Sequence, residues 1–174
     1  MKKIKPKKGG EEYIFRVSVS KESPVLYHGK TNNKIAKLKT MPHRKIGILG
    51  NQNLYKFAEA IVESFDFYFD HCFGFFDNLK NPHKSDKNKS YELFTDIPDI
   101  EPTESKSVKK TKISQAWKKE GEKMLFMFDY GDGWNFLVKL EKITDADLKK
   151  SYPIILEKMG ESPEQYPDYE EDEL

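Results

Sequence analysis

Hydrophobic and polar positions follow two different periods along the chain, and these periods separate strands from helices. From residue 13 to 19, tyrosine, phenylalanine and valine alternate with isoleucine, arginine and serine, which predicts a half-buried strand. Residues 45–49 indicate a second strand. From residue 54 to 68 the apolar positions take helical spacing, opposite lysine and glutamate. We therefore predict a main helix at 54–68, capped by the asparagines of Gly50-Asn51-Gln52-Asn53.

Two segments without clear periodicity flank these elements. Residues 21–43 are polar and rich in lysine, and we predict a loop with a short extended piece at 25–28. A strand is expected at 72–76. Residues 78–112 then lose all periodicity and contain three prolines, which predicts a long irregular excursion with a turn at 91–94.

The C-terminal part contains a β-hairpin. Residues 123–129 are apolar on both faces, Gly131-Asp132-Gly133 is a strong turn signal, and residues 134–141 alternate again. A short helix is expected after residue 113, ended by Gly121. Thr144 and Asp147 resemble a capping box for a one-turn helix, and a last strand is expected at 153–157.

These elements predict an α+β fold. We expect a single domain at 11–167, with an antiparallel-rich sheet, the 54–68 helix on one face and short helices at the margin. Residues 1–10 read as a basic disordered arm and residues 168–174 as an acidic tail.

Composition narrows the classes of protein that fit. Cys72 is the single cysteine, which excludes an internal disulfide framework and a cysteine-rich zinc site. The basic start lacks the apolar run of a secretory signal, and no apolar stretch is long enough to span a membrane. The expected compartment is the cytoplasm.

Charge is spread unevenly although the net charge is only +1. Residues 1–50 hold thirteen lysines and arginines against three glutamates, whereas residues 161–174 hold seven acidic side chains and no basic one. These segments are either solvated ends or a basic arm for nucleic acid beside a competing acidic tail. The binding candidates are Lys34, Lys37, Lys39, Arg44 and Lys45, together with the aromatic Trp134.

The hairpin turn carries the other candidate chemistry. Asp129 and Asp132 flank Gly131, and with His71 they could bind Mg²⁺ or Mn²⁺ for phosphoryl chemistry. Alternatively, both carboxylates bond nearby backbone amides and hold the turn. No histidine pair has helical metal spacing, and no Gly-x-Ser-x-Gly or phosphate-binding glycine loop is present. No cofactor is evident beyond a possible divalent metal.

The segment 126–134, Phe-Met-Phe-Asp-Tyr-Gly-Asp-Gly-Trp, resembles the signature of the plasmid pRiA4b ORF-3-like family. Residues 44–48 and 54–65, Asp70-His71 with Phe75, and the closing segment 160–166 agree in order. The resemblance covers 12–79 and 113–167 and skips the middle. Two positions depart from the family pattern: His43 stands where members generally have tryptophan, and Phe136 stands where they often have histidine.

The resemblance implies a passenger of plasmids and transposable elements, some of which carry a resolvase-type label, and it implies no particular reaction. We therefore expect a non-catalytic binding or accessory module that contacts nucleic acid or a protein partner through residues 30–45 and 78–112. The alternative is a metal-dependent enzyme that acts on phosphoesters through Asp129, Asp132 and His71. No membrane contact is expected.

Overall fold

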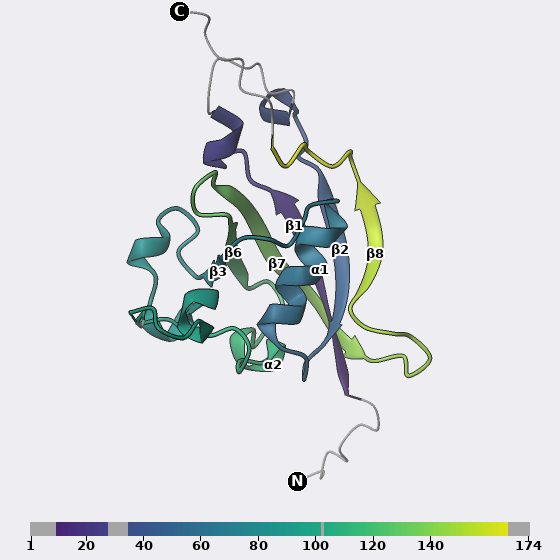
Figure 1. The fold of residues 1–174 in the computed structure, drawn as a ribbon. Helices are drawn as coiled ribbons and strands as arrows, with labels where there is room; N and C mark the ends of the chain where they lie inside the picture. The colour runs from purple at the N-terminus through teal and green to yellow at the C-terminus, as the bar shows by residue number, and fades with distance from the viewer. Residues whose placement is uncertain (1–9, 28–34, 102, 167–174) are drawn as a thin grey trace, which may run out of the picture.

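A single eight-stranded sheet forms the body of the molecule (Figure 1). The computed structural model describes residues 10–27, 35–101 and 103–166. The sheet order is β5-β4-β3-β6-β7-β1-β2-β8, and every neighbouring pair is antiparallel except β4 and β5. The strands are β1 (Glu11–Val19), β2 (His43–Leu49), β3 (Phe73–Phe76), β4 (Ser90–Glu92), β5 (Lys106–Ser107), β6 (Lys123–Phe128), β7 (Trp134–Asp145) and β8 (Ile154–Met159). The predicted α+β class is confirmed.

Helix α1 (Leu54–Ser64) covers one face of this sheet (Figure 1). Asn53 caps it, because its side-chain oxygen accepts a 2.9 Å hydrogen bond from the amide of Lys56. The helix ends earlier than the predicted residue 68. Asp66 takes the left-handed conformation (φ 60°), and the amide of Phe67 bonds back to the Val62 carbonyl, which closes a Schellman-type C-cap.

Aromatic side chains fill the layer between α1 and the sheet. The Phe15 ring lies 4.5 Å from that of Phe57 and 4.7 Å from that of Trp117. Phe57 also stacks on Phe75 at 5.8 Å. All four side chains are fully buried. Trp117 is held at the end of α2 (Ile113–Ala116), the short helix expected after residue 113. These large rings give a compact core from few positions.

The excursion at 78–112 extends the sheet. It contains the short edge strands β4 and β5 and three 3-10 turns, η3 (Pro82–Lys84), η4 (Lys87–Lys89) and η5 (Leu93–Asp96). The turn η5 overlaps the turn predicted at 91–94. Asp96 joins η5 to strand β5, because its carboxylate accepts hydrogen bonds from the Ser107 hydroxyl and from the amide of Val108. The excursion is therefore an ordered wall beside β3.

Two local predictions are wrong. Of the piece at 25–28 that was expected to be extended, residues 25–27 belong to the 3-10 turn η1 (Pro24–Tyr27), in which consecutive Val25 and Leu26 are both buried, and residue 28 lies outside the described residues. The one-turn helix expected after Thr144 does not form, because β7 pairs with β1 as far as Asp145, beyond a register shift between Ile14 and Phe15. Strand pairing thus overrides the local capping signal.

The predicted strands and the hairpin are confirmed. The strands at 13–19, 45–49, 72–76 and 153–157 and the hairpin correspond to β1, β2, β3, β8 and β6–β7, with ends that differ by four residues or fewer. The short helix that was expected to be ended by Gly121 stops earlier, at Ala116. The turn η2 (Ile35–Lys37) lies in the predicted loop. Residues 1–9 and 168–174, predicted to be an arm and a tail, lie outside the described residues. None of the described helices is long and apolar enough to cross a membrane.

Candidate functional site

The turn between β6 and β7 is shaped by Asp129. Its backbone is left-handed (φ 59°), and its Oδ1 accepts hydrogen bonds from the amides of Gly131 and Asp132 at 3.1 and 3.2 Å. The amide of Gly133 closes the turn on the Asp129 carbonyl at 2.7 Å. One carboxylate oxygen of Asp129 therefore holds the turn, as the structural interpretation of this motif predicts. We call residues 129–133 the signature turn.

The second oxygen of Asp129 faces His71. His71 Nε2 lies 3.4 Å from Asp129 Oδ2 and 3.0 Å from the Tyr166 hydroxyl. Tyr166 in turn donates a 2.8 Å hydrogen bond to Asp70. Burial first, and then this hydrogen bond, raise the pKa of Tyr166 to about 12. The structure thus brings His71 and Asp129 together and adds Asp70 and Tyr166, which sequence reasoning did not select although both lie in segments that carry the family resemblance.

The arrangement of possible ligand atoms gives little support to a divalent metal at this cluster. Asp132 contributes its backbone amide to the Asp129 carboxylate, and Asp129 Oδ1 is already engaged. Within residues 10–27, 35–101 and 103–166, no group of three or more histidine, cysteine or acidic side chains is placed to hold a metal ion. The metal site at Asp129, Asp132 and His71 stays a prediction.

Trp134 is a core residue of the hairpin. Its side chain is fully buried, and its indole Nε1 donates a 3.1 Å hydrogen bond to the Gln165 carbonyl. The side-chain amide of Gln165 accepts a hydrogen bond from the Tyr68 backbone amide and donates one to the Tyr68 carbonyl. Trp134 therefore anchors the closing segment 160–166, and its burial disfavours the predicted role as a binding residue that stacks on a base.

Arg44 is also buried, at 1% exposure. Its guanidinium lies 4.4 Å from the centre of the Phe65 ring and donates to the Ser64 carbonyl at the end of α1. Further hydrogen bonds reach the closing segment at the Met159 and Gly160 carbonyls and at the Ser162 hydroxyl. The planar fork of donors suits this clamp. The buried guanidinium is engaged by these partners, which disfavours the predicted role of Arg44 as a phosphate-binding residue.

The lysine candidates differ in their surroundings. Lys37 and Lys39 are exposed, whereas Lys34 lies outside the described residues. Lys45 Nζ forms ion pairs with Glu141 at 3.3 Å and Glu157 at 3.8 Å. The positive charge of Lys45 is therefore already compensated by carboxylates on β7 and β8.

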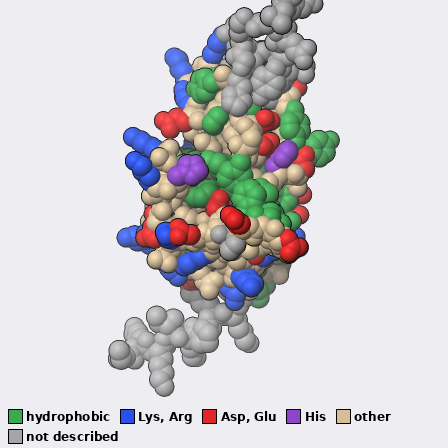
Figure 2. Space-filling view, turned by 60° about the vertical axis from the view of Figure 1, so that its left-hand side comes forward, with side chains coloured by type: hydrophobic (Ala, Val, Ile, Leu, Met, Phe, Trp, Pro, Cys, Tyr) green, Lys and Arg blue, Asp and Glu red, His purple; other side chains and the backbone are tan. Residues whose placement is uncertain are grey.

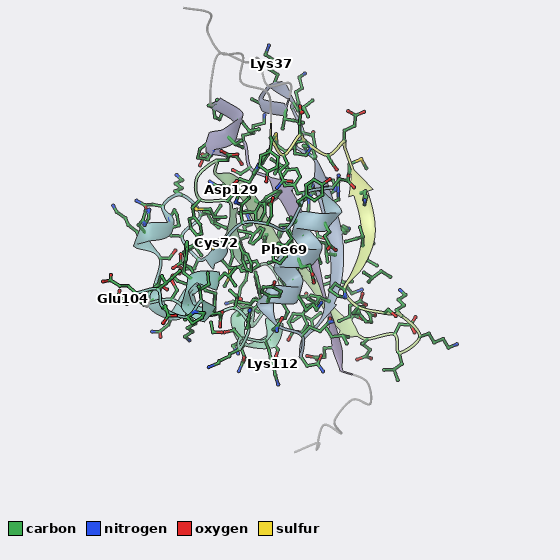
Figure 3. All side chains as sticks on the ribbon, in the orientation of Figure 1. Lys37, Phe69, Cys72, Glu104, Lys112 and Asp129 are labelled. Carbon is green, nitrogen blue, oxygen red and sulfur yellow. The ribbon has the colours of Figure 1, made fainter. Side chains whose placement is uncertain are left out.

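A pocket of about 410 Å³ lies on the other side of the signature turn. Its floor is formed by β3, β4 and β6, and its walls come from the excursion, whose outer margin carries Glu104 (Figure 3). We call it the signature pocket. It is lined by Phe76, Pro82, His83, Ser85, Lys87, Ser90, Glu92, Glu104, Ser105, Met127 and Tyr130.

Tyr130 and Glu92 order the interior of this pocket. Tyr130 donates a 2.8 Å hydrogen bond to Glu92 Oε1, and Ser105 donates a 2.7 Å bond to Glu92 Oε2. Gly74 is required beneath them, because a Cβ there would lie 2.8 Å from the Tyr130 hydroxyl. Sequence reasoning missed this pocket, since Tyr130 and Glu92 are 38 residues apart and only the pairing of β3 with β4 and β6 brings them together.

The signature turn therefore serves two neighbouring sites. Asp129 faces the His71 cluster, and the next residue, Tyr130, enters the pocket. On the face that carries the excursion, hydrophobic side chains gather at the centre with a histidine on either side (Figure 2). Such a mixed surface around a preformed pocket is typical of a binding site.

Comparison with known proteins places this architecture in a family. The profile described as "Plasmid pRiA4b ORF-3-like protein" matches residues 33–168. The match begins at residue 33 and runs through the excursion, whereas the resemblance in the sequence was expected over 12–79 and 113–167. No curated protein matches the chain.

Among solved structures, the chain is similar to a Methanosarcina mazei Go1 protein of unknown function. The TM-score is 0.61 at 20% sequence identity, with 88% of this chain and 72% of that chain covered. This likeness shows a shared fold. Because the family profile spans most of the sequence, the chain belongs to the plasmid pRiA4b ORF-3-like family.

Proposed function

We propose that the chain is a non-catalytic binding module that recognises a protein partner at the signature pocket. The observation that carries this proposal is the Tyr130–Glu92 hydrogen bond, which fixes a polar group inside a preformed pocket. A volume of about 410 Å³ falls in the range of ligand pockets. The floor at Phe76 and Met127 supplies apolar contact area.

The hydrogen bonds of the lining hydroxyls favour binding over covalent catalysis. Ser105 donates to Glu92, and Ser90 donates to the Asp86 carbonyl at 2.9 Å. Ser90 has no base as its hydrogen-bond partner, because a backbone carbonyl does not take up a proton, and the carboxylate beside Ser105 already accepts from Tyr130. The partners of these hydroxyls instead hold the walls of the pocket together.

Electrostatics favours a protein partner over nucleic acid. Two residues selected for nucleic-acid contact, Arg44 and Trp134, are buried, and Lys45 is ion-paired. The signature pocket contains the carboxylate of Glu92, which has no cationic partner among the described residues and repels a phosphate backbone. An accessory role in a mobile element is consistent with the family and remains part of the proposal.

Peptide selection tests the proposal. Peptides would be selected by display on the full chain, and their footprint read from backbone amide shifts in NMR spectra. We expect shifts at residues 82–92, 104–107 and 130, and none with short single- or double-stranded oligonucleotides. Footprints elsewhere, a failure to select any peptide, or salt-sensitive oligonucleotide shifts around Lys37 and Lys39 would each overturn it.

A further inference from the structure

We infer that the group that enters the signature pocket is a cationic amine or guanidinium, seated against the Glu92 carboxylate. This inference rests on the proposed function, because it assigns the chemistry of the group that the same pocket takes. It follows from three features of the pocket: the state of Glu92, the ion pair at the rim and the acceptor character of Tyr130.

Glu92 is a half-buried carboxylate that is oriented but not neutralised. Its two oxygens accept from the hydroxyls of Tyr130 and Ser105, which are uncharged donors. Among the residues that the structure describes, Glu92 has no ion-pair partner. An ionised carboxylate has about four acceptor positions, so each oxygen can accept a further hydrogen bond. Glu92 therefore offers a fixed negative charge with free acceptor capacity.

The cation at the rim is already paired. Lys87 forms an ion pair with Glu104, and both side chains are largely exposed, at 67% and 71%. Their charges compensate each other across the mouth, whereas Glu92 lies deeper, on strand β4. The charge that a ligand meets inside the pocket is thus negative, and a positive ligand group complements it.

Tyr130 adds a second acceptor. Its proton is donated to Glu92, and burial followed by the neighbouring Glu92 charge raises the pKa of Tyr130, so the phenol stays protonated. The Tyr130 oxygen can then only accept from a ligand. Ammonium and guanidinium groups consist of donors alone, and charge-assisted bonds to a carboxylate are the strong ones. An anionic or acceptor-only group has no comparable partner at Glu92 and Tyr130.

The apolar floor fits the stem of such a group. Phe76 and Met127 line the pocket beside Glu92, and the methylenes of a lysine or arginine side chain pack on apolar surface while the charged end makes polar contacts. This chemistry has two sources, a side chain of a partner protein or a free alkylamine. The proposed function favours the side chain.

Three probes and two variants test the inference on the full chain. The probes are N-acetyl-lysine methylamide, its uncharged analogue N-acetyl-norleucine methylamide, and agmatine as a free amine. We expect the lysine probe to shift the resonances of Glu92, Ser105 and Tyr130, and the norleucine probe to leave them in place. Glu92→Gln should lower the affinity for the lysine probe about tenfold or more, which corresponds to the loss of a charge-assisted hydrogen bond.

The matched control is Glu101→Gln, which removes an exposed carboxylate of the excursion that does not line the pocket and should change the affinity less than about threefold. Thermal unfolding checks that both variants fold. Tighter binding of the lysine probe than of agmatine supports a protein side chain, whereas the reverse order assigns the pocket to a free amine and contradicts the protein partner.

The failures of the two proposals are distinguishable. Equal binding of the lysine and norleucine probes, or full affinity in folded Glu92→Gln, overturns the cationic assignment and leaves a binding pocket. If the three probes and the display-selected peptides all fail to shift the pocket resonances, the proposed function fails and the cationic assignment fails with it.

Discussion

The hydroxyl of Tyr130 donates a 2.8 Å hydrogen bond to Oε1 of Glu92 and so joins the signature turn to strand β4. The turn belongs to the hairpin that carries the family signature, and β4 belongs to the excursion. The contact makes the excursion part of the same structural unit as the signature. It also orients the one carboxylate inside the pocket that has no cationic partner among the described residues.

Removing the Tyr130 hydroxyl should cost stability. In Tyr130→Phe, Glu92 loses one of its two hydroxyl donors in a half-buried position, and we expect a loss of about 1–2 kcal/mol in the free energy of unfolding. Urea unfolding at neutral pH measures it. The control is Tyr27→Phe, whose hydroxyl bonds the Lys21 carbonyl on the surface and whose loss should stay below about 0.5 kcal/mol. Equal losses would contradict the role assigned to Glu92.

Two substitutions distinguish the hydrogen bonds of Asp129 that hold the turn from its negative charge, which faces His71. Asp129→Asn keeps an oxygen for the amides of Gly131 and Asp132 and tolerates the left-handed backbone, so we expect a change within about 0.5 kcal/mol. Asp129→Ala loses both acceptor contacts and strains the backbone, which should cost about 2 kcal/mol or more. Thermal and urea unfolding measure both variants. A large loss in Asp129→Asn would show that the charge facing His71, rather than the turn, is essential.

Arg44 should behave as a structural clamp. Arg44→Met leaves the Ser64, Met159 and Gly160 carbonyls without their donor, and we expect a loss of at least about 3 kcal/mol. Lys45→Met on the same strand removes surface ion pairs and should cost no more than about 1 kcal/mol. Hydrogen exchange should show earlier opening of residues 160–166 in Arg44→Met. A mild effect at Arg44 would refute the clamp.

Alkaline pH should loosen the Tyr166 contact. The pKa of Tyr166 is raised from an ordinary 10.0 to about 12, so the fold favours the protonated phenol. Its contribution to stability is complete below pH 10 and is lost as the pH rises toward 12. Unfolding midpoints across this interval should fall more steeply in the wild-type chain than in Tyr166→Phe. Parallel curves would contradict the hydrogen bond from Tyr166 to Asp70.

Divalent metals test the enzyme alternative. Since one oxygen of Asp129 holds the turn and the described residues contain no group of three placed ligands, we expect Mg²⁺ and Mn²⁺ to leave the melting temperature unchanged. A thermal-shift series with the wild-type chain and Asp132→Asn measures this. A metal-dependent rise that disappears in Asp132→Asn would restore a metal site at the signature turn.

Periodicity predicts much of the fold because several elements bury one face. The helix α1 follows from spacing, the hairpin follows from its turn signal together with its apolar pattern, and Asn53 caps α1 as expected. The end of α1 does not follow, because it is set by a tertiary contact in which the Phe67 ring packs 4.8 Å from that of Trp134. Local propensity contains no information on such a contact.

The site was predicted only in part, because burial decides which polar residues are available. Arg44 and Trp134 look accessible in a sequence, yet both are buried as anchors of residues 160–166. The pocket depends on sheet pairing between distant segments, which no local motif indicates.

The most direct measurement follows the methyl group of Met127 in the floor of the signature pocket. Met124 lies on the same strand, buried in the core at 4% exposure, and Met159 lies exposed on β8. In a chain with labelled methionine methyls, titration with a display-selected, lysine-bearing peptide should shift Met127 and leave Met124 and Met159 in place. Binding of the peptide with a stationary Met127 signal, or a shift at Met159 instead, would contradict recognition at the signature pocket.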